Sequence, residues 1–349
     1  MAELKRILEL WKRARAAGEE VCVATVAAVE GSSYRRPGAR MLMTAGGQRV
    51  GTISGGCLEA EVAKKAWWLT ERGACVQRYS SFFDDEGDVP YGLGCGGAIQ
   101  VLLERGDPAR QALEALRRSV EERRAQVVVA NLGTDSKAGP GTELIVDEAG
   151  RETWTRGAGE GARTLAQKAV RAEASQWEGE LFAEYIAPPP ALFVFGAGDD
   201  AQPLVRLAAE LDWHVTVGDG RSHLARAERF AEAAAVKPLK EALREPGARD
   251  AAVAMTHSYE QDREILRALL VRELRYLGVL GPRRRTEHLV EGIAPELGLS
   301  VEECMARLHA PVGLDLGGHA PGAIALSIAA ELQAVFAGVG RRSSAAVPA

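Results

Sequence analysis

The chain has 349 residues, of which 46% are hydrophobic and 26% charged, and its formal net charge is −5 at pH 7. A negative net charge provides no basic field for nucleic acid or for an anionic membrane surface. No apolar run approaches the roughly 20 residues that a membrane-spanning helix needs. We therefore expect a cytoplasmic protein, and the length is enough for two domains.

The first half of the chain predicts an α+β domain. Apolar residues at helical spacing predict helices, which we place at residues 3–17, 58–69, 108–124 and 162–172. Short runs rich in apolar and β-branched residues predict strands, at residues 21–29, 40–44, 48–53, 74–80, 98–103, 126–131, 143–146 and 180–186. Three consecutive prolines then form a stiff extended spacer at residues 188–190. We place the domain boundary there, with domains at residues 1–187 and 188–340 and a disordered tail at 341–349.

Alternating strands and helices follow the spacer and predict a Rossmann-like, doubly wound parallel sheet. We expect strands at residues 191–195, 213–217, 251–256 and 275–280, and helices at residues 203–211, 259–271, 283–291, 300–309 and 320–336. The fold class is thus α/β, with an α+β domain followed by a doubly wound domain.

A glycine loop between a strand and a helix is the first candidate site. It contains Ser54, Gly55, Gly56 and Cys57, so it offers a hydroxyl, a thiol and backbone that can approach a ligand closely. The amides of the following helical turn suit an anion such as phosphate. Residues 94–97 repeat the pattern with a second thiol, Cys95, framed by glycines that include Gly96.

The five cysteines form no CxxC pair and are odd in number, which argues against a disulfide framework and a zinc ribbon. Cys22, Cys75 and Cys304 lie in apolar runs and are expected to be small buried side chains. Cys57 and Cys95 are either nucleophiles, soft ligands for sulfur or a metal-bearing cofactor, or small residues in tight turns. We favour soft ligands because glycine frames both, whereas all six histidines lie in the second domain.

The second candidate site is a dinucleotide motif. Gly196, Gly198 and Ala201 stand between a predicted strand and a predicted helix, and Asp219 follows at the end of the next strand. This arrangement is typical of NAD(P) binding, in which the glycines accommodate the diphosphate and the acid binds a ribose hydroxyl. Two aspartates at residues 199–200 place negative charge where the phosphates would lie. A Rossmann fold that no longer binds nucleotide is therefore an open alternative.

His257 follows another strand of the second domain. Ligands of open α/β sheets bind at the carboxyl ends of the strands, so a functional role and a hydrogen bond within the loop both remain open.

Long motifs in both domains resemble the XdhC/CoxI family, the accessory factors of xanthine dehydrogenase and related molybdenum hydroxylases. They lie at residues 31–41, 54–59 and 94–97, and at 195–201, 255–257, 280–286 and 309–315. Tyr34 departs from the family pattern, in which proline is frequent at this position.

The resemblance implies a maturation factor that binds the molybdenum cofactor (molybdopterin), assists its sulfuration and passes it to an apo-hydroxylase. A cysteine desulfurase and cofactor-biosynthesis enzymes are the implied partners, and a homodimer is expected. Thiolates of Cys57 and Cys95 are then candidates to contact the molybdenum, and Arg35, Arg36 or Arg40 to hold the phosphate.

Two other hypotheses remain beside this cofactor chaperone without turnover. An NAD(P)-dependent oxidoreductase is suggested by the dinucleotide motif, although the first domain offers no evident acid–base pair. A pure interaction module with a vestigial Rossmann domain is the third.

Overall fold

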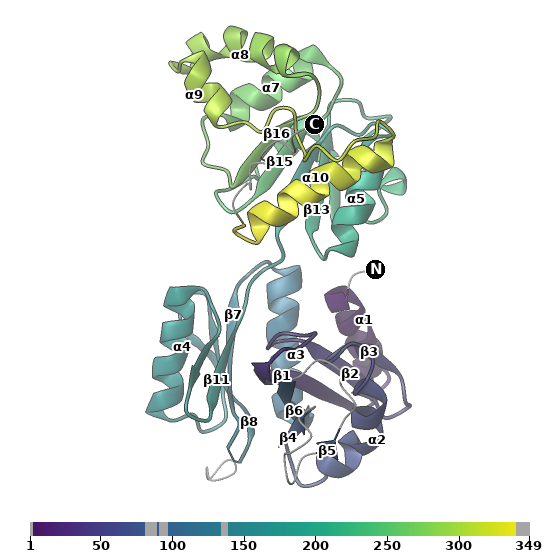
Figure 1. Cartoon of the computed structure of the whole chain (residues 1–349), viewed down its shortest axis with the longest axis vertical. Helices are drawn as coiled ribbons and strands as arrows, with labels where there is room; N and C mark the ends of the chain where they lie inside the picture. The colour runs from purple at the N-terminus through teal and green to yellow at the C-terminus, as the bar shows by residue number, and fades with distance from the viewer. Residues whose placement is uncertain (1–2, 81–88, 91–96, 134–138, 340–349) are drawn as a thin grey trace, which may run out of the picture. The chain divides into compact units, whose positions relative to one another are not determined.

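The computed structural model describes residues 3–80, 89–90, 97–133 and 139–339. The contacts divide the chain into two units, one ending at Pro188 and one starting at Pro189 (Figure 1). Each unit has its own sheets and its own hydrophobic core. The predicted tail at 341–349 and the candidate residues Cys95 and Gly96 lie outside the described residues.

A six-stranded sheet with the order β3-β2-β1-β6-β4-β5 forms the first part of the N-terminal unit. Its pairs are antiparallel except the parallel pair β4–β5. The strands are β1 (Val21–Gly31), β2 (Arg40–Thr44), β3 (Arg49–Gly51), β4 (Cys75–Ser80), β5 (Val89–Pro90) and β6 (Gly97–Arg105), and the accompanying helices are α1 (Glu3–Ala16), α2 (Glu59–Leu69) and α3 (Gly106–Glu121).

Strand β1 lies in the interior of this sheet, between β2 and β6, and its side chains are buried on both faces. Val23 packs with α1 and α3 on one face. Ala24 and Val26 point to the other face and pack with α2. Residues that alternate along a strand point to opposite faces, so one apolar run supports two layers of helix.

A second sheet in the same unit has the order β10-β11-β7-β8-β9, and α4 (Glu160–Ala172) packs against one of its faces. Its strands are β7 (Gln126–Asn131), β8 (Gly141–Asp147), β9 (Glu152–Thr155), β10 (Gln176–Glu178) and β11 (Leu181–Ile186). The sequence analysis missed β9 and β10. Both are short, with mostly exposed side chains, so neither carries the apolar run by which strands are recognised.

Polar contacts join the two sheets of this unit. The guanidinium of Arg40 on β2 forms an ion pair with the Glu184 carboxylate on β11, and both side chains are largely buried. The Trp177 indole donates a hydrogen bond of 2.9 Å to the carbonyl of Ala27. The Arg40–Glu184 pair links the two sheets strongly, because a buried charge is costly to leave without its partner.

The C-terminal unit is a parallel five-stranded sheet with the order β14-β13-β12-β15-β16. Its strands are β12 (Ala191–Phe195), β13 (His214–Asp219), β14 (Ala235–Pro238), β15 (Ala251–Ala254) and β16 (Tyr276–Val279). Its helices are α5 (Ala201–Glu210), α6 (Leu239–Ala242), α7 (Tyr259–Leu269), α8 (Arg283–Leu297), α9 (Val301–Ala306) and α10 (Pro321–Phe336).

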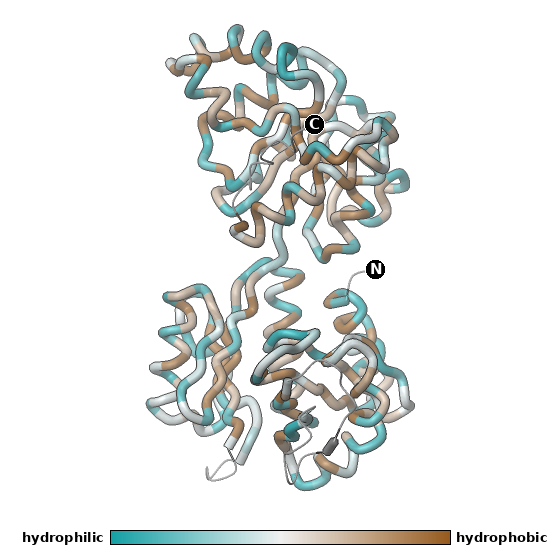
Figure 2. The backbone as a smooth tube through the Cα atoms, viewed as in Figure 1, coloured by the Kyte–Doolittle hydropathy of each residue, from teal (hydrophilic) through white to brown (hydrophobic). Residues whose placement is uncertain are grey.

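Helices cover both faces of this parallel sheet. Helices α7 and α8 contribute to one core cluster, and α5 and α10 contribute to the other (Figure 1). Hydrophobic residues run along the strands and along α10 (Figure 2). The predicted doubly wound fold is confirmed, although the short strand β14 was missed because its side chains are only partly buried.

No helix within the described residues is long and apolar enough to cross a membrane.

We predict that the substitution Arg40→Met destabilises the protein by about 3–5 kcal/mol, since it leaves the buried Glu184 carboxylate without its cation. Burial raises the pKa of Glu184, and Arg40 opposes that rise. Urea denaturation is the measurement. The double variant Arg40→Met/Glu184→Leu should recover most of the loss, and a double variant as unstable as the sum of its single changes would contradict this account.

Candidate functional site

The glycine loop between β3 and α2 is braced from within. The Glu59 carboxylate accepts hydrogen bonds from the backbone amides of Ile53 (3.0 Å) and Ser54 (2.9 Å) and from the Ser54 hydroxyl (2.7 Å). The Ser54 oxygen in turn accepts a bond of 3.0 Å from the Leu58 amide. Ser54 and Glu59 are both buried. These groups therefore hold the loop, and the structure does not support the expectation that the Ser54 hydroxyl faces a ligand.

Hydrogen bonding outweighs burial in setting the charge state of Glu59. Burial raises the pKa of this carboxyl, but the hydrogen bonds from Ser54 and Ile53 lower it further, to a net value below 4.5. The brace is therefore an anion at neutral pH. It occupies the amides that an incoming anion would otherwise meet.

Gly55, Gly56 and Cys57 remain exposed at the tip of the same loop. Gly56 has a φ of +112°, a conformation that side chains with a Cβ rarely adopt. At Gly55 an added Cβ would make ordinary contact, 3.6 Å from the Tyr34 ring. The Tyr34 side chain is 69% exposed. The tip thus presents bare backbone and a free thiol, with an aromatic ring against one side.

The cysteines that were expected to be inert are buried or partly buried. Cys22 and Cys304 have no exposed surface. Burial raises the pKa of the Cys22 thiol to about 12 and also raises that of Cys75. Cys57 is therefore the exposed thiol among the cysteines that the structure describes.

The loop that carries the motif arginines packs against the cysteine loop and against β6. An added Cβ at Gly97 would lie 2.1 Å from the Ser32 carbonyl oxygen, so a side chain cannot fit there. This close approach explains the last glycine of the 94–97 motif as a packing requirement.

The three motif arginines have different environments. Arg35 is held by Glu3 at 3.1 Å and by the Thr52 hydroxyl. Arg40 is buried beside Glu184, so the structure does not support it as a phosphate ligand. Arg36 is exposed, and its guanidinium makes no hydrogen bond or ion pair with any residue that the structure describes. The available cation on this loop is therefore Arg36.

The Rossmann glycine turn is also engaged with its own chain. Gly196 has a φ of +128°, and an added Cβ would lie 2.5 Å from the Met255 carbonyl oxygen. This glycine therefore permits the close approach of β12 and the end of β15. A Cβ added at Gly198 would contact only the side chain of Asp200, which can move aside. Ala201 is buried at the start of α5.

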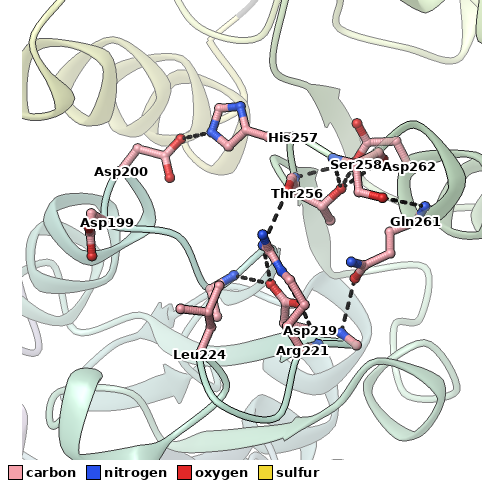
Figure 3. Close-up of polar contacts among 12 residues, drawn as sticks. Asp199, Asp200, Asp219, Arg221, Leu224, Thr256, His257, Ser258, Gln261 and Asp262 are labelled. Carbon is pink, nitrogen blue, oxygen red and sulfur yellow. Dashed lines mark hydrogen bonds and ion pairs between the residues drawn. The ribbon is translucent and has the colours of Figure 1, made fainter.

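Asp219, the expected ribose-binding acid, has its oxygens occupied (Figure 3). It accepts from the Ala197 amide at 2.7 Å, and Arg221 donates to it through its backbone amide and its guanidinium. Burial raises the pKa of Asp219, but these bonds lower it to a net value below the usual one. Asp219 therefore braces the glycine turn. The expectation of a free ribose acceptor is not supported.

Both carboxylates of the turn, those of Asp199 and Asp200, have partners of their own, and Figure 3 shows the partner of Asp200. Arg229 lies 2.6 Å from Asp199. Asp200 lies 2.6 Å from the His257 Nε2 atom. His257 is exposed and has a left-handed φ of 57°, an uncommon backbone state for a residue other than glycine. The structure thus joins His257 to the glycine turn.

The sequence analysis missed three arginines that form ion pairs with aspartates of this unit. Arg221 follows Asp219 by two residues, a spacing that was available as a signal. Arg229 and Arg285 reach their partners, Asp199 and the buried Asp262, across the fold. No cluster of three or more His, Cys, Asp or Glu side chains suited to a metal ion occurs in the part of the chain that the structure describes.

We predict that Glu59→Gln destabilises the protein by about 2 kcal/mol at neutral pH, because a neutral amide cannot replace an anion that accepts three hydrogen bonds. The folded pKa of Glu59 lies below 4.5, so its contribution is present above that pH and is lost as pH falls through the folded pKa. Denaturant unfolding at several pH values should show the gap closing in acid. The control Glu61→Gln removes a carboxylate of the same helix whose partner is Lys65, one turn along, and should show little change at any pH.

The two exposed glycines should respond differently to alanine. Gly56→Ala forces a Cβ into a positive-φ conformation and is expected to cost about 1–2 kcal/mol. Gly55→Ala adds only an ordinary contact with Tyr34 and should change stability by less than about 0.5 kcal/mol. Thermal unfolding of both variants is the measurement. Equal destabilisation would mean that the loop conformation is not set by Gly56.

Comparison with known proteins places these features in a family. Residues 192–332 match the XdhC Rossmann domain, and residues 14–80 match the XdhC and CoxI family. A protein of Bacillus subtilis (strain 168) described as a probable xanthine dehydrogenase subunit is 31% identical over 323 residues, which cover 90% of this chain and 92% of that protein. The molybdenum cofactor insertion chaperone PaoD of Escherichia coli (strain K12) is 25% identical over 331 residues, 95% of this chain and 88% of that protein.

A solved structure supports the same assignment over the full length. The crystal structure of a xanthine dehydrogenase from Bacillus halodurans is 29% identical, with a TM-score of 0.77, and covers 99% of this chain and 98% of that one. The matched regions contain the cysteine loop and the glycine turn described above. The chain belongs to the XdhC and CoxI family.

Proposed function

We propose that this protein is an accessory factor that binds the molybdenum cofactor and delivers it to a xanthine dehydrogenase-type molybdenum hydroxylase. The observation that carries the proposal is the exposed Cys57 at the tip of a loop whose base is held by hydrogen bonds of Ser54 and Glu59. The names of two relatives, a molybdenum cofactor insertion chaperone and a probable component of xanthine dehydrogenase, point to the same role.

The chemistry of the loop tip suits this cargo. A thiolate is a soft ligand and is suited to a sulfur-rich metal centre. Gly55 and Gly56 leave the backbone bare, so a bulky ligand can approach closely. Arg36 supplies a cation whose side chain has no partner among the described residues, which suits the phosphate of the cofactor. The exposed ring of Tyr34 offers a flat apolar surface for the pterin.

The same arrangement favours holding the cargo over converting it. A nucleophilic cysteine needs an adjacent base, and residues 1–188 contain no histidine. Glu59, the carboxylate nearest to Cys57 in sequence, is buried and engaged in three hydrogen bonds. We therefore propose a carrier without turnover. Cys95 and Gly96 belong to the proposed site by motif alone.

The proposal extends to partners and setting. A cysteine desulfurase would supply the sulfur that replaces an oxo ligand of the cofactor, and cofactor-biosynthesis enzymes would supply the cofactor itself. We propose that handover takes place in the cytoplasm from a homodimer. A monomer at all concentrations in light scattering would contradict the dimer without affecting the carrier role.

The alternative function, an NAD(P)-dependent oxidoreductase, has less support. Asp219 is engaged with Arg221, and Asp199 and Asp200 carry negative charge where a diphosphate would lie. NAD(P)H turnover with a small substrate would favour it over the carrier.

We predict near-stoichiometric molybdenum and pterin in protein purified without oxygen from a cofactor-producing host. Cys57→Ser and Cys95→Ser should lose most of both, because serine is a hard and weakly acidic ligand. The matched control is Cys75→Ser, whose partly buried thiol has a raised pKa. Metal analysis and the fluorescence of the oxidised pterin are the measurements. A wild-type protein without cofactor, or equal loss in the control, would overturn the proposal.

A further inference from the structure

Helix α2 carries two consecutive tryptophans, one packed and one exposed (Figure 1). Trp67 is half-buried, packs against a core cluster of the N-terminal unit, and has the Arg105 guanidinium 5.1 Å from its ring centroid. Trp68 is 72% exposed, the largest exposed fraction among the large hydrophobic side chains that the structure describes. Tryptophan is enriched among the residues that dominate protein interfaces, so an indole left in water indicates a contact with another molecule.

Trp68 ends a row of exposed side chains that starts beside the cysteine loop. Ala60, Lys64 and Trp68 are all exposed and follow one another at intervals of four residues, so they share one face of α2. Ala60 comes one helical turn after Cys57 in the sequence. The whole helix is about 16 Å long, at 1.5 Å per residue. The exposed face therefore extends from the thiol to the indole.

The distance between this face and the thiol is fixed by the fold. Glu59, the first residue of α2, accepts hydrogen bonds from two backbone amides of the cysteine loop. Val62 and Ala66 are fully buried on the opposite side of the helix and pack into the core. A molecule that binds the exposed face thus takes a defined position relative to Cys57.

The charges on this face favour an acidic partner. Lys64 precedes the exposed indole by one turn, and Arg72 follows it in the turn after the helix. Both are exposed and form no ion pair with any residue that the structure describes, and the same holds for the exposed Glu71. Lys65 is neutralised by Glu61 at 2.6 Å. Two free cations against one free carboxylate leave the face positive, on a chain whose net charge is −5.

A protein fits this face better than a membrane does. Helices that bind membrane surfaces bury a broad apolar side and carry many cations. The exposed side of α2 instead has a single aromatic side chain between two free cations. One indole with charges around it is the pattern of an anchor that enters a pocket on a partner protein.

We propose that the face of α2 formed by Lys64, Trp68 and Arg72 is the docking surface for the client hydroxylase, which supplies an apolar pocket for the indole and acidic side chains around it. This inference rests on the proposed carrier function and adds to it the place where the client binds. A client held at Trp68 lies within one helix length of Cys57, so docking and transfer use two ends of the same rigid element.

Surface plasmon resonance tests this surface, with the full chain and the apo form of xanthine dehydrogenase from the same organism, produced in a host that makes no molybdopterin. We expect saturable binding that Trp68→Ala weakens about thirtyfold, the effect of an interface hot spot. Leu326→Ala is the matched control, because Leu326 is 54% exposed on α10 of the other unit. It should leave the affinity within about twofold. Trp68→Ala should keep the molybdenum content of the wild type, so that loss of docking and loss of cofactor are separate readouts.

The charges are tested by reversal. Lys64→Glu/Arg72→Glu should slow association about tenfold at low salt and less at high salt, because exposed charges steer the encounter and are screened by ions. Arg171→Glu is the matched control, since Arg171 is exposed at the end of α4 and has no ion pair with any described residue. Equal slowing by the control would overturn the role of Lys64 and Arg72.

Three results would overturn the docking surface itself. The first is equal affinity of Trp68→Ala and the wild type for the apo-hydroxylase, or no binding by either. The second is a change from dimer to monomer on Trp68→Ala in light scattering, which would assign the face to a second copy of this chain. The third is binding to phosphatidylglycerol vesicles that Trp68→Ala abolishes, which would assign it to a membrane. A wild-type carrier without molybdenum would contradict the proposed function alone, since the docking measurement needs no cofactor.

Discussion

A buried carboxylate accepts hydrogen bonds from the backbone of each glycine loop, and both candidate sites depend on it. Glu59 binds the amides of Ile53 and Ser54 in the cysteine loop. Asp219 binds the Ala197 amide in the Rossmann turn. Glycine-rich backbone gains much conformational entropy on unfolding, so such loops need fixed partners to hold one shape. In this chain Glu59 and Asp219 provide such partners from within the fold.

These internal hydrogen bonds determine which groups of the loops are left to bind a ligand. Amides near the loops, which in many proteins bind phosphate, are satisfied by carboxylates here. Under the proposed function, recognition falls to side chains beside the first loop, Cys57 and Arg36. Each is exposed, and each differs in chemistry from its surroundings. A search based on glycine spacing alone locates the loop but not the group that makes contact.

The sequence predicted the layers of the fold well because burial produces long apolar runs. Strand β7, at Gln126–Asn131, was predicted with its observed bounds, and the parallel sheet followed from alternation of strands and helices. The role of Arg40 was not predictable, because its partner Glu184 lies 144 residues away and one sequence carries no sign of that contact. The pairing of Asp219 with Arg221 was within reach, since the two are separated by a single glycine. The motif encouraged a ligand role because spacing does not reveal whether an acid is already neutralised.

A carrier must hold its cargo firmly enough to protect it and weakly enough to release it. Binding to a flexible loop costs free energy for ordering, and that cost is removed when the loop is braced beforehand. In the proposed carrier, the Glu59 brace would allow useful affinity from very few contacts: one thiol, one cation and a stretch of bare backbone. With so few contacts between carrier and cofactor, a client protein would have to replace only a few interactions to take the cofactor over. The exposed position of Cys57 would serve the same end in the proposed carrier, because a partner could reach the cargo without opening the fold.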